Sequence, residues 1–427
     1  MGGRVSRPNE NPREEETAMP KTPARRRPIT REEALRRQEQ KRHIEEKRQE
    51  SRELSKGPID LPFCLLVMLL TAIGLVMLLS ASFPSSLSES NGQDALAYFK
   101  RQAAFAVLGI SAMGIISRIN YQRFRGAARA LLYLALFLLV LVIIPGNPLS
   151  ITMNNATRWL GVGNIFSFQP SEVAKMAVVL YFADSISHKR EKMRTTRYGI
   201  APYLVIMGVI AFLMMLEPHL SGTVLILGTG AVMMFVGGIL WRWVALAFGF
   251  VGVVATLMFT GVITYGQSRI AMWLDPFIDP RGEGYQLSQS LITIGSGGVW
   301  GRGLGKGIQK FLYLPEEHND FIFAVVCEEL GLIGASIIIL LFMALILRGY
   351  WIAIHARDRF GSLLVVGVVT LIALQTFLNI AVVTGTVPTT GISLPFFSYG
   401  GTALTMQLAE MGVVLSVSRQ MKPTKAG

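Results

Sequence analysis

Carboxylates that could act as bases lie at the edge of a long apolar run. Asp320 ends a polar stretch, the run FIFAVVC follows it at once, and Glu328 and Glu329 come about two turns later. An Asp at such a border is most often a helix N-cap. Partial desolvation there would also raise its pKa toward that of a general base. Both interpretations of Asp320 remain open from these residues alone.

A cation and a carboxylate lie together in a second apolar setting, the segment FQPSEVAKMA. Pro170 suits the first turn of a helix. Glu172 and Lys175 then lie three residues apart on one helical face. They could form an ion pair that makes a buried polar face tolerable, or Lys175 could meet the phosphate of a ligand. Either Glu328 or Glu329 could also pair with a basic residue such as Lys175.

Basic residues also lie in a glycine-rich segment, GSGGVWGRGLGKG at 295–307. Arg302 and Lys306 are two of the five basic residues between 264 and 320, and we expect an anionic ligand for them. The glycines fit neither phosphate-loop template, and the sequence has no Cys/His cluster with metal-ligand spacing. The metal ligands are therefore unknown and no cofactor is certain, but Mg²⁺ or Mn²⁺ could be held jointly with a phosphate-bearing substrate.

A proline- and glycine-rich segment, GTVPTTGISLPFFSYGG at 385–401, interrupts the last apolar runs. Its Ser398 and Tyr399 follow two phenylalanines. The segment could be a re-entrant or interfacial loop with an aromatic belt. It could also form one wall of a groove for a lipid-linked ligand.

The composition shows what must position these groups. The 427 residues are 51% hydrophobic and only 16% charged, against about 25% charged in soluble domains. Much of the charge is terminal, since residues 1–60 hold 16 of the 41 Lys and Arg. The two cysteines, Cys64 and Cys327, lie in apolar runs and imply no disulfide framework. A soluble enzyme, a secreted disulfide scaffold and a nucleic-acid-binding domain are therefore excluded in favour of a polytopic membrane protein.

The apolar runs predict an all-α membrane bundle with about ten spans, because each is close to the roughly 20 residues that a span needs. Basic residues in alternate short loops place both termini on the cytoplasmic side. The predicted parts are a disordered polar tail at 1–60 that attracts anionic lipids, a membrane domain at 61–420 and a short tail at 421–427. The longest connection, 264–320 between spans 7 and 8, is expected outside. The expected spans are 61–82, 103–117, 130–145, 171–187, 200–216, 221–239, 242–263, 321–347, 362–384 and 400–418.

Five long segments together resemble the SEDS family, which contains FtsW, RodA and SpoVE. They are LVMLLSAS, NNATRWLGVGNIFSFQPSEVAK, GYQLSQSLITIGSGGVWGRGLGKG, YLPEEHNDFIFAVVCEELG and PTTGISLPFFSYGGTALT, in the family's order. The sequence departs from the family at EPHLSGT, where His219 stands in place of a common carboxylate or amide. It departs again at Asn319, where the family often has Thr.

The resemblance implies a peptidoglycan glycosyltransferase that polymerises lipid II on the outer face of the bacterial cytoplasmic membrane. It implies that Asp320 and Lys175 match essential residues and that Arg158, beside Trp159, matches a family arginine. We also expect Glu172, Arg302, Lys306, Glu329, Ser398 and Tyr399 to contact the substrate.

The implied partners are a class B penicillin-binding protein and divisome or elongation proteins, and nucleic acid is not expected. The motifs are closer to FtsW and SpoVE than to RodA, so a role in septal wall synthesis is predicted. A RodA-like elongation role, a SpoVE-like sporulation role and a lipid II flippase are the alternatives. A transporter would favour an inverted repeat, and none is evident.

Overall fold

The structure is a computed structural model that describes residues 57–144, 146–153, 156–162, 166–260, 267–311 and 313–421. Most of the expected N-terminal tail and residues 422–427 lie outside the described residues. The first helices are α2 (Leu61–Glu89), α3 (Ala97–Ser117) and α4 (Gln122–Ile143). The strands β1 (Ser150–Met153), β2 (Ala156–Val162) and β3 (Phe166–Phe168) follow. The remaining elements are α5 (Pro170–Lys189), η1 (Arg190–Arg194), η2 (Thr196–Ile200), α6 (Ala201–Leu216), α7 (Leu220–Val236), α8 (Trp241–Phe259), α9 (Gln267–Leu274), α10 (Tyr285–Gly297), α11 (Ile322–Ile354), α12 (Arg359–Val383) and α13 (Gly401–Ser418).

A long helix lies at each expected membrane span: α2 to α8 and α11 to α13. Among the described residues, six helical segments are long and apolar enough to cross a membrane. This confirms a helical polytopic membrane protein, while the number of ten spans stays a prediction. Two expected spans were too short at their N-terminal ends, because basic residues such as Lys100 and Arg123 lie in the first turns of α3 and α4.

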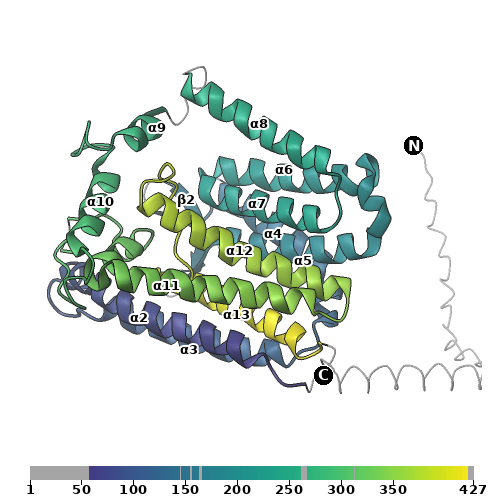
Figure 1. Cartoon of the computed structure of the whole chain (residues 1–427), viewed down its shortest axis with the longest axis horizontal. Coiled ribbons are helices and arrows are strands. Elements are labelled where there is room, and N and C mark those ends of the chain that lie inside the picture. The colour runs from purple at the N-terminus through teal and green to yellow at the C-terminus, as the bar shows by residue number, and fades with distance from the viewer. Residues whose placement is uncertain are drawn as a thin grey trace, which may run out of the picture. The chain divides into compact units, whose positions relative to one another are not determined.

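Helix α12 lies at the centre of the bundle, with 72% of its most apolar 18-residue window buried. Figure 1 shows α11 running alongside it, and α12 also packs against α5 and α7. Small residues permit this close approach. At Gly367 of α12, a Cβ would come within 2.6 Å of Val179 Cγ1 on α5. The deeply buried α12 therefore supports the segments that lead into α5, α7 and α11, the helices packed against it.

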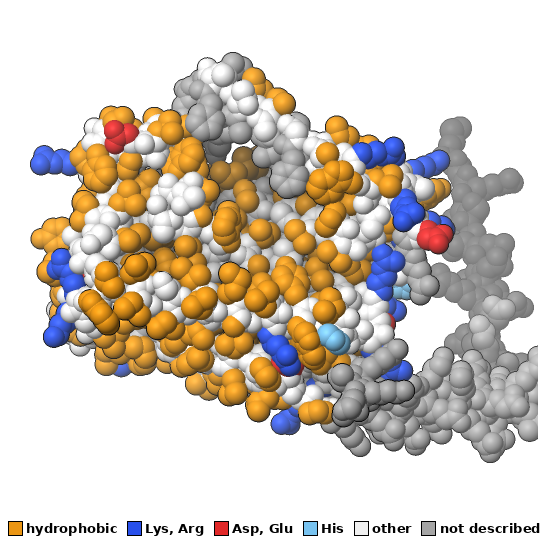
Figure 2. Space-filling model, in the orientation of Figure 1, with side chains coloured by type: hydrophobic (Ala, Val, Ile, Leu, Met, Phe, Trp, Pro, Cys, Tyr) orange, Lys and Arg blue, Asp and Glu red, His pale blue; other side chains and the backbone are white. Residues whose placement is uncertain are grey.

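The outer surface of the helices is apolar, as the bilayer requires. Figure 2 shows hydrophobic side chains covering much of the visible face along the helices. Tyr133 of α4 is 69% exposed and Phe212 of α6 is 64% exposed, and both are large apolar side chains without a protein neighbour over most of their surface. We interpret this surface as the lipid-facing side of the bundle.

The connection between α4 and α5 forms a small antiparallel sheet in the order β1-β2-β3. Ser150 pairs with Leu160, and Leu160 pairs with Phe168. The sequence analysis did not predict this sheet, because its strands are only four, seven and three residues long. Its third strand leads directly into α5, so the sheet fixes the side chains of β2 relative to the start of α5.

Candidate functional site

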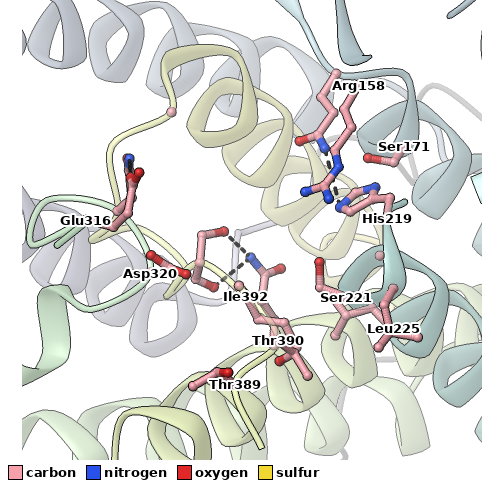
Figure 3. Close-up of a pocket in the computed structure, with 18 of the residues that line it drawn as sticks. Arg158, Ser171, His219, Ser221, Leu225, Glu316, Asp320, Thr389, Thr390 and Ile392 are labelled. Atoms are coloured by element: carbon pink, nitrogen blue, oxygen red, sulfur yellow. Dashed lines mark hydrogen bonds between the residues drawn. The ribbon is translucent and has the colours of Figure 1, made fainter. Parts of the chain in front are cut away.

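A cavity of about 770 Å³ opens among segments that are far apart in the sequence. Figure 3 shows Glu316 and Asp320 on one side, with Arg158, Ser171 and His219 facing them from the other. The lining comes from β2, the start of α5, the turn between α6 and α7 with the first turns of α7, and the segments 316–320, 389–393 and 399–403. Further lining residues lie on α9, at the start of α10 and on α12. Six of the residues predicted from the sequence line this one cavity: Arg158, Trp159, Glu172, Lys175, Asp320 and Tyr399.

Asp320 presents to the cavity a carboxylate with one unpaired oxygen, as far as the described residues show. Its Oδ1 is buried and makes no hydrogen bond within the described part of the chain. Helix α11 begins after it, with Phe321 at the cap position and no side-chain capping bond from a described residue. The N-cap interpretation of Asp320 is therefore wrong, and the structure leaves its carboxylate free for other chemistry.

The surroundings of Asp320 favour its neutral form. Burial raises its pKa to about 7, and the nearby Glu316 carboxylate adds to the rise. The backbone N–H of Asp320 and the imidazole of His318 act in the opposite direction but do not cancel it. Residue Asp320 as a whole is only half-buried, so water and a substrate can reach it. A carboxylate with a pKa near neutrality can accept and return a proton at physiological pH.

A compact turn holds Asp320 at the cavity wall. The N–H groups of Asn319 and Phe321 donate to the carbonyl of Glu316, at 3.0 and 3.3 Å. The N–H of Tyr399 donates to the carbonyl of His318 at 2.8 Å. The segment around Asp320 is thus tied both to itself and to the segment that precedes α13.

The opposite side of the cavity carries cations. Lys175 Nζ lies 2.7 Å from Glu172 Oε2, which confirms the predicted pairing of these two side chains. Lys175 is only 6% exposed, yet it lines the cavity. Arg158 Nε donates to the carbonyl of Glu217 at 3.2 Å, and its Nη2 donates to the carbonyl of Pro218. Arg158 therefore lies over the turn between α6 and α7, beside Lys175.

That turn contains His219, at the position where the resemblance to the SEDS family predicts a carboxylate or an amide. The residue is only 8% exposed, and its Nδ1 has no hydrogen-bond partner among the described residues. Burial, with the positive charges of Arg158 and Lys175, lowers the pKa of His219 to about 3. Burial raises the pKa of Glu217 to about 8 despite the nearby Arg158. At physiological pH this turn therefore presents a neutral imidazole to the cavity.

Four predicted substrate-binding residues do not line this cavity: Arg302, Lys306, Glu329 and Ser398. The glycine-rich segment instead packs against a break in α11. The N–H groups of Arg302 and Gly303 donate to the carbonyls of Glu328 and Glu329, at 2.9 and 3.0 Å. Lys306 points to the surface, and Ser398 Oγ donates to the carbonyl of Asn319 at 2.6 Å. Their contact with substrate stays a prediction.

Glu328 and Glu329 do pair with basic residues, as predicted, but Lys175, the example given, is not the partner. Glu329 Oε1 lies 2.7 Å from Lys310 Nζ, and Glu328 Oε1 lies 3.7 Å from Arg302 Nε. Lys310 follows the glycine-rich segment, and the fold of that segment brings its amine to α11. The pairing depends on this tertiary contact, which the spacing of charges along the sequence does not show.

The sequence analysis also missed two hydroxyls in the cavity wall. Ser171 Oγ and Thr390 Oγ1 are buried, and neither has a hydrogen-bond partner among the described residues. Both lie inside the segments that resemble the SEDS family, and this was the available signal. Free hydroxyls beside Lys175 and Asp320 can donate to, or accept from, a polar ligand.

These features define a class of protein: a polytopic membrane helix bundle with a polar cavity. The cavity holds a carboxylate whose pKa is near 7, opposite two cations. A family model described as "Cell cycle protein", covering FtsW, RodA and SpoVE, matches residues 61–423. The chain belongs to this family, as its sequence resemblance predicted.

Individual relatives and solved structures agree with this membership. Stage V sporulation protein E of Bacillus subtilis is 42% identical over 364 residues, which cover 84% of this chain and 97% of that protein. A probable peptidoglycan glycosyltransferase FtsW of Geobacter sulfurreducens is 40% identical, covering 85% and 96%. A chain from a structure described as the coordination of polymerization and crosslinking by a peptidoglycan synthase complex has a TM-score of 0.70 and 27% identity, covering 85% and 98%. Thermus thermophilus RodA has a TM-score of 0.62 and 26% identity, covering 86% and 99%.

Proposed function

We propose that this chain polymerises lipid II into glycan strands, with Asp320 as the general base. As a member of its family, with close relatives named for the activity, the chain is a peptidoglycan glycosyltransferase. The observation that carries the assignment of the base is the Asp320 carboxylate, which has no described partner at Oδ1 and lies in one cavity with Lys175 and Arg158. A base and cations in one cavity suit a reaction that removes a proton and releases a phosphate-bearing group.

In the proposed step, the GlcNAc 4-hydroxyl of the acceptor attacks C1 of the donor MurNAc. The new bond joins that hydroxyl oxygen to C1, and the bond from C1 to the pyrophosphate oxygen breaks. The hydroxyl proton passes to Asp320, and undecaprenyl pyrophosphate leaves with the electron pair. A single displacement inverts the anomeric centre from α to β, as in inverting glycosidases.

Lys175 and Arg158 would stabilise the charge that develops on the leaving pyrophosphate. Fixed cations in a partly desolvated site supply much of the catalysis in such reactions. Within the described residues Lys175 is ion-paired with Glu172, and because it also lines the cavity, a second anion can approach its ammonium group. Trp159 and Tyr399 add apolar faces to the same cavity, where a sugar ring could stack.

A divalent cation would have to share its ligands with the substrate. Within the described ranges, no group of three or more His, Cys, Asp or Glu residues could hold a metal ion. This fits Mg²⁺, which is usually bound by one or two carboxylates together with substrate phosphates. Glu172, which pairs with Lys175 in the cavity, would be the carboxylate that holds such an ion. When bound, the ion would offset phosphate charge.

The partner, location and cellular role complete the proposal. We propose a class B penicillin-binding protein as partner, because a structural neighbour comes from a peptidoglycan synthase complex.

Both termini would lie in the cytoplasm and the cavity would open outside, with the basic tail attracted to anionic lipids. Septal synthesis with divisome proteins is the role we favour, and the similarity to FtsW and SpoVE sequences supports it over RodA-like elongation. A SpoVE-like role in sporulation is the main alternative.

The test is polymerisation of lipid II by the full chain purified in detergent, with and without the cognate penicillin-binding protein. Wild type should give glycan polymer on a gel, while Asp320→Ala should give none and stay folded, with a melting temperature no lower than that of wild type. Failure of wild type to form polymer under either condition, together with lipid II translocation in liposomes, would replace the transferase with a flippase. Unfolding of Asp320→Ala would return Asp320 to a structural role.

A further inference from the structure

One buried amide on α12 joins the two segments that flank the Asp320 side of the cavity. Asn379 is fully buried, and its Nδ2 donates to the backbone carbonyl of Asp320 at 2.7 Å. The same Nδ2 donates to the carbonyl of Ile392, also at 2.7 Å. Both N–H groups of a single side chain are thus used to hold segment 316–320 against segment 389–393.

A second amide repeats this arrangement one turn earlier on α12. Gln375 Nε2 donates to the carbonyl and to the hydroxyl of Ser393, each at 3.0 Å. Residues four apart lie on the same face of a helix. One face of α12 therefore carries two amides that fasten segment 389–393, and the deeper of them, Asn379, also fastens Asp320.

The turn bonds described above hold the neighbouring residues, and the Asn379 bond is the one made to the carbonyl of Asp320 itself. Asp320 Oδ1 has no described partner, and the residue precedes α11 without capping it. Figure 3 shows Asp320 beside Ile392 and Thr390, which belong to the segment that Asn379 also holds. The backbone of Asp320 is the part that Asn379 binds, and the backbone sets where the free carboxylate points.

Asn379 is anchored on a rigid platform. Helix α12 is the most buried of the candidate spans, so its side chains have few alternative positions. Asn379 Oδ1 has no partner in the described structure, and the orientation of the amide follows from its two donated bonds. Catalytic groups held on rigid elements keep their geometry better than groups held only by loops.

We propose that Asn379 is a positioning residue for the glycosyltransferase reaction: it fixes the main chain of Asp320 relative to segment 389–393. The inference rests on the proposed function of Asp320 as base. It assigns no contact between Asn379 and the substrate, since Asn379 is not part of the cavity lining. Asn379 acts only through the main chain that it holds, at Asp320 and at Ile392.

The first test compares Asn379→Ala and Asn379→Asp with a matched control on the same helix. Asn379→Asp keeps the size of the side chain and replaces its donors. Thr376→Val is the control, because Thr376 is buried, lies outside the cavity lining and has an Oγ1 without a described partner. The full chain with its penicillin-binding protein is assayed for kcat, for KM with lipid II and for melting temperature.

Both Asn379 variants should lose about 100-fold in kcat, since misplacement of a reacting group by about 1 Å has an effect of this size. KM should stay within about twofold of wild type, because binding contacts are intact, and Thr376→Val should match wild type. Activity of Asn379→Ala within about threefold of Thr376→Val would overturn the proposal. Unfolding of both Asn379 variants, while Thr376→Val stays folded, would also overturn it and make Asn379 a folding residue.

The second test reads the position of Asp320 without using activity. A hydrophobic carbodiimide modifies protonated carboxyls, and mass spectrometry can follow its reaction at Asp320 against pH. The charged and titratable groups that act on this carboxyl from its own segment are Glu316 and His318. Those that line the rest of the cavity are Arg158, Glu172, Lys175, His219, Arg269, Glu283 and Tyr399.

In wild type the labelling should fall with a midpoint near the pKa of about 7. In Asn379→Ala the loosened carboxyl gains water, so the midpoint should move toward the ordinary Asp value of 3.8. An unchanged midpoint would count against the positioning role. If wild type makes no polymer, the proposed function fails, and this labelling still decides whether Asn379 positions Asp320.

Discussion

Two lysine–glutamate pairs in this protein have the same N···O distance and different surroundings. Lys175 and Glu172 are 2.7 Å apart at the cavity, and Lys310 and Glu329 are 2.7 Å apart beneath the glycine-rich segment. Distance alone would give the two pairs the same role. What separates them is how fully each group is hydrogen-bonded by the rest of the protein.

The Lys310–Glu329 pair is enclosed by partners. Lys310 Nζ also donates to Ser80 Oγ at 2.8 Å and to the carbonyl of Gly305 at 3.0 Å. Glu329 accepts from Ser80 Oγ and from the N–H groups of Gly305 and Gly307. A buried ion pair is tolerated when its remaining donors and acceptors are satisfied in this way. We conclude that this pair fastens the glycine-rich segment to α2 and α11.

The Lys175–Glu172 pair is left open on one side. Glu172 is the only side chain found bonded to Lys175 within the described residues, and both residues line the cavity. Unused hydrogen-bonding capacity in a concave site is typical of groups that meet a ligand. We conclude that the charged groups with a functional role are those whose hydrogen-bonding groups the protein leaves partly unused. Burial and ion pairing do not distinguish them.

The largest effect should come from Lys175→Gln. Loss of one fixed donor to a developing oxyanion costs about 10²- to 10³-fold in kcat, so glycan polymerisation should nearly disappear. The melting temperature should change little, because the cavity can admit water to Glu172. Steady-state polymerisation rates and thermal unfolding in detergent measure both quantities. Substantial activity in Lys175→Gln would remove the distinction between the two pairs.

Lys310→Met should give the opposite pattern, with the main loss in stability. Breaking a buried pair leaves an uncompensated charge on Glu329 and costs about 3–5 kcal/mol. Adding Glu329→Met to it should recover most of that loss, since apolar replacement of a whole pair is often neutral. Thermal unfolding of the single and double variants measures the coupling. Equal stability of Lys310→Met and wild type would show that the Lys310–Glu329 pair does not hold the glycine-rich segment to α2 and α11.

A smaller effect, which changes gradually with pH, is expected on the polymerisation rate. Asp320 Oδ1 has no hydrogen-bond partner among the described residues and can take up a proton, whereas the Glu329 carboxylate is already hydrogen-bonded. With a pKa of about 7, the base loses its active, ionised form below neutrality. The rate should fall about tenfold for each pH unit below 7 and level off above it. A flat profile between pH 5.5 and 8 would argue against Asp320 as the base.

The same shift predicts a stability effect. The folded pKa of Asp320 is raised above the ordinary value of 3.8, so its contribution to stability is greatest below that value and is lost as the pH rises to about 7. Asp320→Asn should therefore raise the melting temperature more at pH 8 than at pH 5. The comparison of the two melting temperatures at each pH is the measurement.

Much of the site could be predicted from the sequence because its residues lie in long matched segments. Glu172, Lys175 and Asp320 were identified from their types and settings, Arg158 from the family resemblance, and all four line one cavity. Asn379 could not be found in this way. It lies inside an apolar helix, where a single amide gives no signal until its two acceptors are known.

The sequence by itself determined the class of protein and the positions of its long helices along the chain. A membrane span needs about 20 consecutive apolar residues, and this is a local property of the sequence. The sequence also determined the pair of Glu172 and Lys175, which lie three residues apart on one helix. Only the tertiary structure decided which other charges are enclosed and which remain free. Ser80 meets Glu329 across 249 residues and Asn379 meets Asp320 across 59. Such bonds follow from helix packing, and packing depends on the whole chain at once.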